Sequence, residues 1–322
     1  METAENRYDQ LTDRIAALYD EGLQQVALDL LDTAEPDLAP WAAELAHLRA
    51  CLLGSLGEST EALAALQRAS DAGGWWDEGI LTEDDDLIGL QHLPAFQAIV
   101  DLSRTRRVTR HDPPLIQLPG GKPAAPAAQG GTVARPSASE QGGVAAGPGV
   151  VVALHGAGQR AAHAMRDWAG VLELGYVLVG VESSRLMSPM YRTWPDPAEA
   201  AADIARALEQ LPAELTALPM IAAGFSAGGR VAINWAVSAD PVPVGGAVVL
   251  APALRELPEQ AQGTLSPASI VIGTEDDLLE VVDGAEQRLT KLGFTVERVP
   301  GLGHEIPQDF AARLADLLPS CG

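Results

Sequence analysis

Basic residues, cysteines, aromatic side chains and long apolar runs are all scarce in this 322-residue sequence. Lys and Arg number 21 against 44 Asp and Glu, and the net charge of −23 argues against binding to nucleic acid or to anionic membrane surfaces. Two cysteines are too few for a disulfide framework. Because no apolar run is long enough to cross a bilayer and no secretory signal pattern stands near the start, we expect a cytoplasmic protein without a transmembrane segment.

The acidic residues are spread unevenly along the chain. Residues 1–102 carry 21 acidic against 4 basic residues, 103–149 carry 2 against 6, and 150–322 carry 21 against 11. A chain of this length should hold more than one domain. We therefore predict a small helical domain over 1–102, a linker over 103–149 and a larger domain over 150–322. The linker could contain a first strand between 108 and 118, followed by a flexible Gly/Pro/Ala loop.

The first domain contains a repeat offset by 35 positions, close to the 34-residue tetratricopeptide period. The matching pairs are Gly22 with Gly57, Ala27 with Ala62, Leu31 with Leu66 and Ala34 with Ala69. The sequence is similar to tetratricopeptide repeats in these small and apolar positions, whereas the expected aromatic positions are mostly aliphatic. The resemblance implies helical hairpins, closed by helices between Trp75 and Phe96. Such a domain either docks a protein or peptide partner at residues 1–102 or only caps the rest of the chain.

The most informative motif is Gly224-Phe225-Ser226-Ala227-Gly228, a GxSxG pattern. An uninterrupted apolar run over 219–223 precedes it, as in a strand buried on both faces, and a helical pattern follows it. A serine on such a sharp turn has its hydroxyl exposed above the sheet. The flanking glycines are expected because larger side chains would collide with the neighbouring backbone.

Three further landmarks stand in a fixed order around this serine. A buried strand at 149–154 runs into the loop His155-Gly156-Ala157-Gly158, which can turn a backbone N–H toward a substrate. Downstream, a strand at 268–272 ends near Glu275, Asp276 and Asp277, and a strand at 295–300 leads to His304. The carboxyl ends of parallel strands meet at one edge of a sheet, so we expect these groups to converge there.

The order of the loop at 155–158 (the HG loop), the serine, the acid and the histidine resembles the α/β-hydrolase superfamily over residues 148–320. The chain looks most like capless esterases of the phospholipase/carboxylesterase or dienelactone-hydrolase-like type. Residues 181–185 and 191–196 support this resemblance, since they are similar to the Ser-Ser and Trp-Asp segments of predicted esterases in that group. The expected fold is thus a doubly wound, mostly parallel α/β sheet preceded by a small all-α domain.

The resemblance implies roles for five residues. Ser226 would be the nucleophile and His304 the base, and Asp276 would orient His304, with Asp277 and Glu275 as alternatives for the acid. The backbone N–H groups of Ala157 and Ala227 would form the oxyanion hole.

Other residues are candidates for the lining of a substrate pocket: His155, Gly156, Met187, Met190, Tyr191 and Trp194. Met187, Met190, Tyr191 and Trp194 could equally cover the sheet edge, and His155 could shape its loop. The remaining histidines are scattered without Cys or carboxylate partners at metal-ligand spacing, so we predict no metal and no cofactor. We read the acidic run at 83–86 as a solvated helix start.

The sequence therefore predicts a serine esterase that cleaves a small acyl ester or thioester through an acyl-enzyme. A peptidase or an acyltransferase would need the same three catalytic residues. A different alternative is a repeat-domain adaptor with an inactive hydrolase body.

Overall fold

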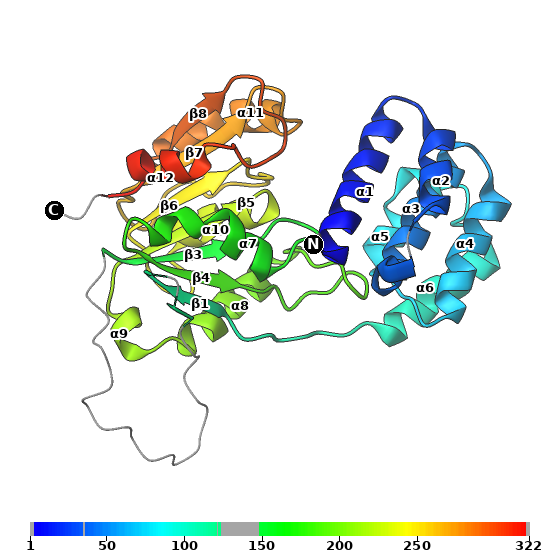
Figure 1. Cartoon of the computed structure of the whole chain (residues 1–322), viewed down its shortest axis with the longest axis horizontal. Coiled ribbons are helices and arrows are strands. Elements are labelled where there is room, and N and C mark those ends of the chain that lie inside the picture. The colour runs from blue at the N-terminus through cyan, green and yellow to red at the C-terminus, as the bar shows by residue number, and fades with distance from the viewer. Residues whose placement is uncertain (1–2, 35, 121, 124–147, 320–322) are drawn as a thin grey trace, which may run out of the picture. The chain divides into compact units, whose positions relative to one another are not determined.

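The computed structural model describes residues 3–34, 36–120, 122–123 and 148–319. The chain forms two compact units (Figure 1). The first unit contains residues 1–109 and the segment Leu186–Arg192, and the second contains residues 110–185 and 193–322. The boundary predicted at residue 102 lies inside a helix, Pro94–Arg106, that belongs to the first unit. Most of the predicted Gly/Pro/Ala loop lies outside the described residues.

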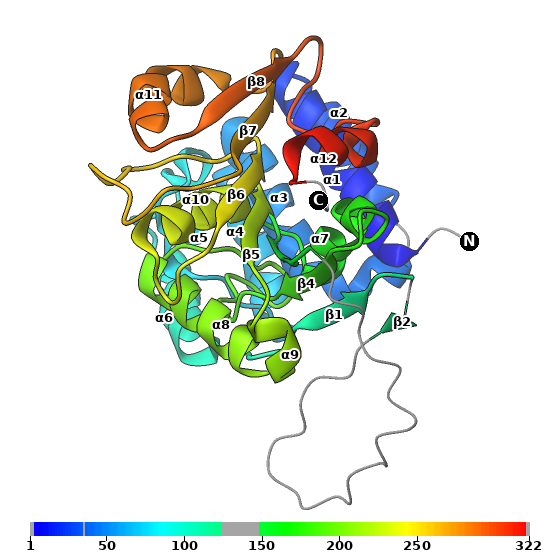
Figure 2. The same ribbon diagram turned by 90° about the vertical axis from the view of Figure 1, so that its left-hand side faces the viewer.

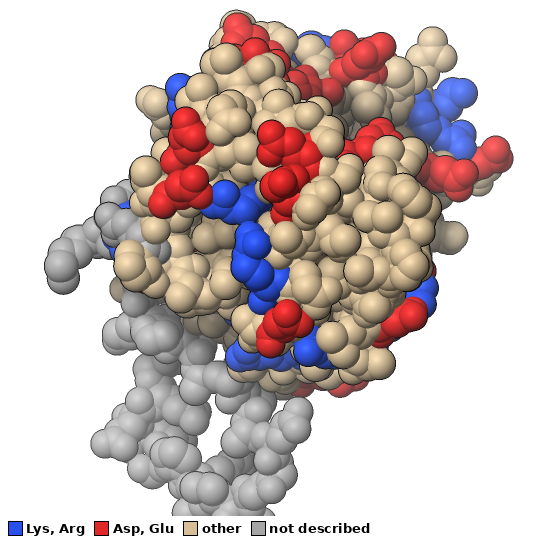
Figure 3. Space-filling view, turned by 90° about the vertical axis from the view of Figure 1, so that its right-hand side faces the viewer, with Lys and Arg blue, Asp and Glu red and all other residues tan. Residues whose placement is uncertain are grey.

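The first unit is entirely helical in its N-terminal part. Its elements are α1 (Ala4–Asp20), α2 (Gln24–Asp32), η1 (Pro36–Trp41), α3 (Ala42–Ser55), α4 (Ser59–Asp71), α5 (Glu78–Thr82), η2 (Asp85–Leu87) and α6 (Pro94–Arg106). On the face drawn in Figure 3, separate groups of acidic side chains lie among uncharged surface and basic side chains. Some charges of this unit are paired, since Arg49 lies 2.6 Å from Asp32 and Arg104 lies 2.5 Å from Glu78.

The 35-residue offset corresponds to two helical hairpins with the same turn. Gly22 between α1 and α2 has φ 75°, and Gly57 between α3 and α4 has φ 79°. In each turn, the residue after the glycine donates its N–H to a carbonyl five residues earlier, at 2.8 Å. Such a helix end favours glycine because other residues are strained at positive φ.

The core of this unit forms where the hairpins meet. Ala27 and Ala62 are fully buried at equivalent positions, so the paired helices approach closely. The predicted closing segment contributes Leu87 and Phe96, both fully buried, and Trp76, whose indole N–H donates to the Ala43 carbonyl at 3.0 Å. The segment between 75 and 96 therefore completes the helical core.

The segment Leu186–Arg192 belongs to the first unit, the helical unit, although the strand Val177–Val181 of the second unit precedes it. Its Ser188 hydroxyl and Met190 N–H donate to one carboxylate oxygen of Glu44, at 2.6 and 2.8 Å. The Asp77 N–H donates to the Met187 carbonyl. Glu44 is 6% exposed, and these bonds satisfy its buried Oε1, whereas Oε2 is buried without a hydrogen-bond partner among the described residues.

The second unit is built on an eight-stranded sheet in the order β2-β1-β4-β3-β5-β6-β7-β8 (Figure 2). The strands are β1 (Leu115–Leu118), β2 (Lys122–Pro123), β3 (Val150–Leu154), β4 (Val177–Val181), β5 (Met220–Phe225), β6 (Gly246–Leu250), β7 (Ala268–Gly273) and β8 (Thr295–Val299). β1 pairs antiparallel with β2 and β4, and all other pairs are parallel. The predicted fold class, a mostly parallel α/β sheet, is confirmed.

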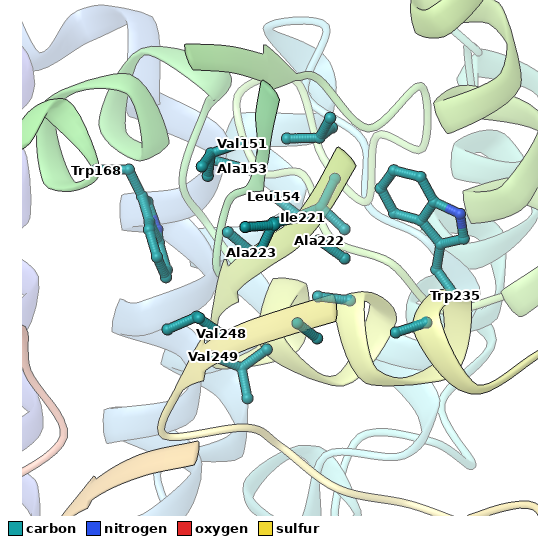
Figure 4. Close-up of a cluster of buried hydrophobic side chains, with 14 of the residues drawn as sticks. Val151, Ala153, Leu154, Trp168, Ile221, Ala222, Ala223, Trp235, Val248 and Val249 are labelled. Atoms are coloured by element: carbon teal, nitrogen blue, oxygen red, sulfur yellow. The ribbon is translucent and has the colours of Figure 1, made fainter. Parts of the chain in front are cut away.

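Helices cover both faces of the sheet, which explains why its central strands are apolar throughout. The helices are α7 (Ala161–Asp167), η3 (Ala169–Leu172), α8 (Pro197–Glu209), α9 (Ala213–Thr216), α10 (Ala227–Ser238), α11 (Leu279–Lys291) and α12 (Phe310–Leu317). Figure 2 shows α7 and α12 on one face and α8, α10 and α11 on the other. Trp168 and Trp235 pack on opposite faces of the central strands (Figure 4).

Candidate active site

Ser226 stands at the turn between β5 and α10, with φ 53° and ψ −118°. A positive φ is rare for a residue with a side chain, and such strain persists only where the surroundings hold it. A Cβ on Gly224 would lie 2.5 Å from the Gly228 backbone, and a Cβ on Gly228 would lie 2.2 Å from the Leu154 carbonyl oxygen. The two glycines of the motif are thus required for β3, β5 and α10 to pack around the serine.

Asp276 and His304 come together at the ends of β7 and β8. His304 Nδ1 lies 2.9 Å from Asp276 Oδ2, and Asp276 Oδ1 accepts from the Leu278 N–H at 2.8 Å. The Asp276 carboxylate is fully buried, whereas the His304 side chain is 34% exposed. Glu275 and Asp277 are both exposed. Of the three candidate acids, Asp276 therefore makes the bond to the histidine.

The His304 imidazole lies against Phe225, the residue before Ser226. Their ring centroids are 4.8 Å apart, with an angle of 33° between the planes. Because Asp276 holds Nδ1, the neutral imidazole keeps its lone pair on Nε2, which can accept a proton. The structure brings Ser226, His304 and Asp276 to the same edge of the sheet, as the strand order predicts.

The two backbone N–H groups predicted to form the oxyanion hole have no hydrogen-bond partner within the described chain. Neither the Ala157 nor the Ala227 N–H donates to another group of those residues, whereas the Gly156 N–H donates to Gln159 Oε1 at 2.9 Å. Ala227 begins α10, where the first N–H groups have no partner inside the helix. Gln159 was missed by the sequence reasoning because a glutamine in a loop carries no motif of its own.

His155 is wholly buried and bonded on both sides. Its Nδ1 lies 2.7 Å from the Gly156 carbonyl, and its Nε2 accepts from the Ser183 N–H at 3.2 Å. The Trp194 indole N–H donates to the His155 carbonyl at 2.8 Å, and the two rings lie 5.0 Å apart. Both side chains are less than 3% exposed. They therefore fix the start of the loop that contains Ala157, and neither presents a free polar group to a ligand.

The predicted lining residues Met187, Met190 and Tyr191 lie in the segment that belongs to the helical unit. All three are half-buried, and burial raises the pKa of Tyr191. Gly156 stays beside the site, where a Cβ would lie 3.1 Å from the Phe225 ring. Whether these four residues contact a substrate stays a prediction.

Arg230 is a further buried group that the sequence reasoning missed. It lies one helical turn after Ser226, is 6% exposed and donates to the Trp194 carbonyl at 2.6 Å. Burial, followed by the nearby Arg255, lowers the pKa of its guanidinium. Arg230 therefore ties the turn that holds Ser226 to the residue that supports the HG loop.

The helical unit contains a group of metal-ligating side chains, beside which the expected absence of a metal stays a prediction. The sequence indicates no histidine with Cys or carboxylate partners, yet the fold brings His47, Cys51 and Asp84 together in the helical unit. Asp84 is 33 residues from Cys51, so the sequence spacing does not reveal it. Among the described residues, this is the one such group, and none surrounds Ser226.

Residues 7–111 match the family A/B hydrolase-like, N-terminal domain. The match leaves the tetratricopeptide resemblance of this region unconfirmed, although the two helical hairpins exist. A search of curated proteins gives no match to this sequence. No helix in the described part of the chain is long and apolar enough to cross a membrane.

Several solved structures are similar to this chain. An uncharacterized protein from Bacillus cereus ATCC 10987 is 21% identical, with a TM-score of 0.48 over 96% of this chain and 97% of that chain. Esterase PE8 is 21% identical, with a TM-score of 0.44 over 54% of this chain and 94% of that chain. The Bacillus cereus carboxylesterase is 18% identical, with a TM-score of 0.43 over 53% and 89%.

Proposed function

Because this chain joins an A/B hydrolase-like N-terminal domain to a sheet with the α/β-hydrolase fold, we propose that it is a serine hydrolase. Its substrate is a small carboxylic ester or thioester, cleaved through an acyl-enzyme. Ser226 is the nucleophile, His304 the general base and acid, and Asp276 the residue that orients the imidazole. Nothing found in the comparisons supports a protein partner for residues 1–102.

In this mechanism, Ser226 Oγ attacks the ester carbonyl while His304 Nε2 takes the hydroxyl proton. The carbonyl oxygen becomes negative and accepts hydrogen bonds from the Ala157 and Ala227 N–H groups. His304 then gives its proton to the leaving alcohol or thiol. Water repeats the attack on the acyl-enzyme, again with His304 as base, and Ser226 is restored. Asp276 stabilises the charged imidazole in both halves of the reaction.

The backbone of Ser226 is the observation that carries the proposal. A conformation at φ 53° and ψ −118° is unfavourable for serine, and three backbone bonds hold it. The Ser226 N–H donates to the Leu250 carbonyl, and the Ser226 carbonyl accepts from Arg230 and Ala253, all at 3.0–3.1 Å. A serine in an ordinary turn would not need this support.

The absence of a helical insertion between β6 and β7 favours an open substrate mouth. Residues 251–267 contain no helix or strand. A lid domain at this place would cover the ends of the strands, as lids do in enzymes that sequester their substrates. We therefore propose short or medium acyl groups.

A fluorophosphonate probe tests the proposal directly. We expect one adduct per chain, located by mass spectrometry on the peptide that contains Ser226. The variant Ser238→Ala, which changes an exposed serine at the other end of α10, should label like the wild type. A parallel series of p-nitrophenyl esters, thioesters and anilides of graded acyl length would define the substrate class. No adduct at Ser226 together with no turnover of any ester would refute the proposal.

A further inference from the structure

The helical unit contains three side chains of metal-ligating type that the proposed reaction does not use. His47 and Cys51 are four residues apart on α3, so they lie on the same face of the helix. Asp84 stands directly before η2. One donor atom from each residue lies within 4.8 Å of the other two.

The separations of these donor atoms match one face of a coordination tetrahedron. Cys51 Sγ lies 3.2 Å from Asp84 Oδ2 and 3.6 Å from His47 Nε2, and His47 Nε2 lies 3.6 Å from Asp84 Oδ2. A point about 2.0 Å from all three atoms exists at the centre of this triangle, close to the bond lengths of about 2.0–2.3 Å that zinc makes with N, O and S donors.

The carboxylate of Asp84 is already oriented for such a role. Its Oδ1 accepts the Asp86 N–H at 3.0 Å, which leaves Oδ2 facing Cys51 and His47. The Asp86 carboxylate in turn accepts the Tyr19 hydroxyl at 2.9 Å. Bonds of this kind commonly fix the ligands of a metal ion from outside the coordination sphere.

The charges around the three side chains also favour a cation. Asp84, Asp85 and Asp86 follow one another, and no Lys or Arg in the described ranges forms an ion pair with any of them. Asp84 pairs only with His47, which carries charge only when protonated. A divalent cation would neutralise this acidic stretch.

We propose that His47, Cys51 and Asp84 bind one Zn²⁺ ion. A nitrogen, a thiolate sulfur and a carboxylate oxygen together suit a borderline-soft ion, whereas Mg²⁺ and Ca²⁺ select oxygen donors. The side chains of His47 and Asp84 are 18% and 27% exposed, so a water molecule can take the fourth position.

Binding requires two proton changes that balance the charge. The Cys51 thiol proton leaves to solvent, and the thiolate sulfur bonds to the ion. The His47 Nε2–H, which faces the Ile80 carbonyl at 3.2 Å, moves its proton to Nδ1, so that the Nε2 lone pair can bind. Without the ion, the Cys51 thiol donates a hydrogen bond to Asp84 Oδ2 at 3.2 Å.

A competing interpretation makes Cys51 a catalytic nucleophile with His47 as its base. Nucleophilic cysteines lie at electropositive, accessible positions. Cys51 lies within a regular helix, and its thiol faces the Asp84 carboxylate. The metal site is the interpretation that these contacts favour.

Zinc and cobalt titrations of the full-length, chelator-treated protein test the proposal. We expect one Zn²⁺ per chain by elemental analysis after dialysis, and a cobalt–thiolate charge-transfer band on addition of Co²⁺. Cys51→Ser should abolish the band, and Cys51→Ser and Asp84→Asn should each weaken zinc binding at least about 100-fold. Circular dichroism of each variant would show that the helical unit remains folded.

Two matched variants serve as controls. Asp85→Asn changes an exposed neighbour of Asp84, and Cys321→Ser removes the other cysteine of the sequence. Both should bind zinc like the wild type, and Mg²⁺ should not compete. A wild type without zinc, or zinc binding that survives Cys51→Ser, would overturn the proposal and leave the trio as a metal-free hydrogen-bonded group. These outcomes do not depend on whether Ser226 is catalytic.

Discussion

Each of the two units contains a nucleophile-type side chain, an imidazole and a carboxylate, and we propose catalysis for one trio and metal binding for the other. Ser226, His304 and Asp276 come from the ends of three different strands. In the helical unit, His47 and Cys51 share one helix, and Asp84 completes the group. The residue types are similar in the two trios, and the difference between them lies in the backbone.

The backbone around Ser226 provides what the helical trio lacks. Ser226 has a strained φ of 53° and stands before the first helical N–H groups, which have no partners inside the helix. Cys51 lies inside α3, where backbone N–H groups bond to the preceding turn and cannot stabilise an oxyanion. Under the two proposals, backbone strain and free N–H groups, more than the residue types, distinguish the nucleophile Ser226 from the ligand Cys51.

Removing the serine hydroxyl is the most severe test of this comparison. We expect Ser226→Ala to lower kcat for a p-nitrophenyl ester by about 10⁴-fold or more, because the covalent step is lost. Steady-state kinetics would measure the change. If the variant kept most of its turnover, a different nucleophile, with Cys51 as the first candidate, would have to carry the reaction.

Neutralising the acid of the serine trio should have the next largest effect. Asp276→Asn would present an amide to His304 Nδ1 and favour the wrong imidazole tautomer, so we expect a loss of about 10³–10⁴-fold in kcat at neutral pH. Asp277→Asn changes the exposed neighbour and should leave kcat within a few-fold of the wild type. Equal effects of the two variants would contradict the role assigned to Asp276.

A glycine of the GxSxG motif and a glycine of a helical hairpin turn can be compared through the stability of their alanine variants. In Gly228→Ala the new methyl would lie 2.2 Å from the Leu154 oxygen, and overpacking of this kind costs about 1–3 kcal/mol or more. Gly57→Ala meets nothing within 4 Å, so only its positive φ is strained, at about 1 kcal/mol. Thermal unfolding and ester hydrolysis would be measured together. Gly228→Ala should also lose activity, whereas Gly57→Ala should keep it. Loss of activity in Gly57→Ala alone would contradict the placement of the active site at Ser226.

Removing the Trp194 hydrogen bond that supports the HG loop should have the smallest effect on kcat. Trp194→Phe removes the indole N–H that donates to the buried His155 carbonyl, and loss of such a buried hydrogen bond costs about 1–3 kcal/mol of stability. We expect kcat to fall several-fold with little change in KM, because the Ala157 N–H is less well held. Trp235→Phe loses an equivalent bond, to the Val242 carbonyl at 2.8 Å, away from this loop. It should reduce stability alone, and a similar fall in kcat would argue against a specific role for Trp194.

The sheet and the serine trio follow from local sequence patterns. β3, β5 and β7 are short apolar runs, β8 alternates polar and apolar residues, and the carboxyl ends of parallel strands must meet at one edge, so the proximity of Ser226, Asp276 and His304 could be predicted. The resemblance favoured Asp276 but left Glu275 and Asp277 open, because three consecutive acids differ only in where the backbone points after β7. Only the structure shows that Asp276 turns inward while Glu275 and Asp277 face solvent.

Contacts between distant segments were the part that the sequence could not supply. Asp84 meets Cys51 across 33 residues, and Glu44 meets Ser188 across 144. Neither pair belongs to a periodic pattern, so no helix or strand rule connects them. The 35-residue offset did indicate the two hairpins, because the glycine at each turn and the small residue at each crossing are local requirements.

The bonds of Glu44 to the segment Leu186–Arg192 also affect the folding of the chain during synthesis and the design of fragments. The chain leaves the helical unit after Thr109 and returns for residues 186–192, so no single cut separates the two units. A fragment that ends at Thr109 lacks Ser188 and Met190, and it would leave a buried carboxylate without its donors. During synthesis, the helical unit therefore reaches its final contacts only after β3 and β4 have been translated.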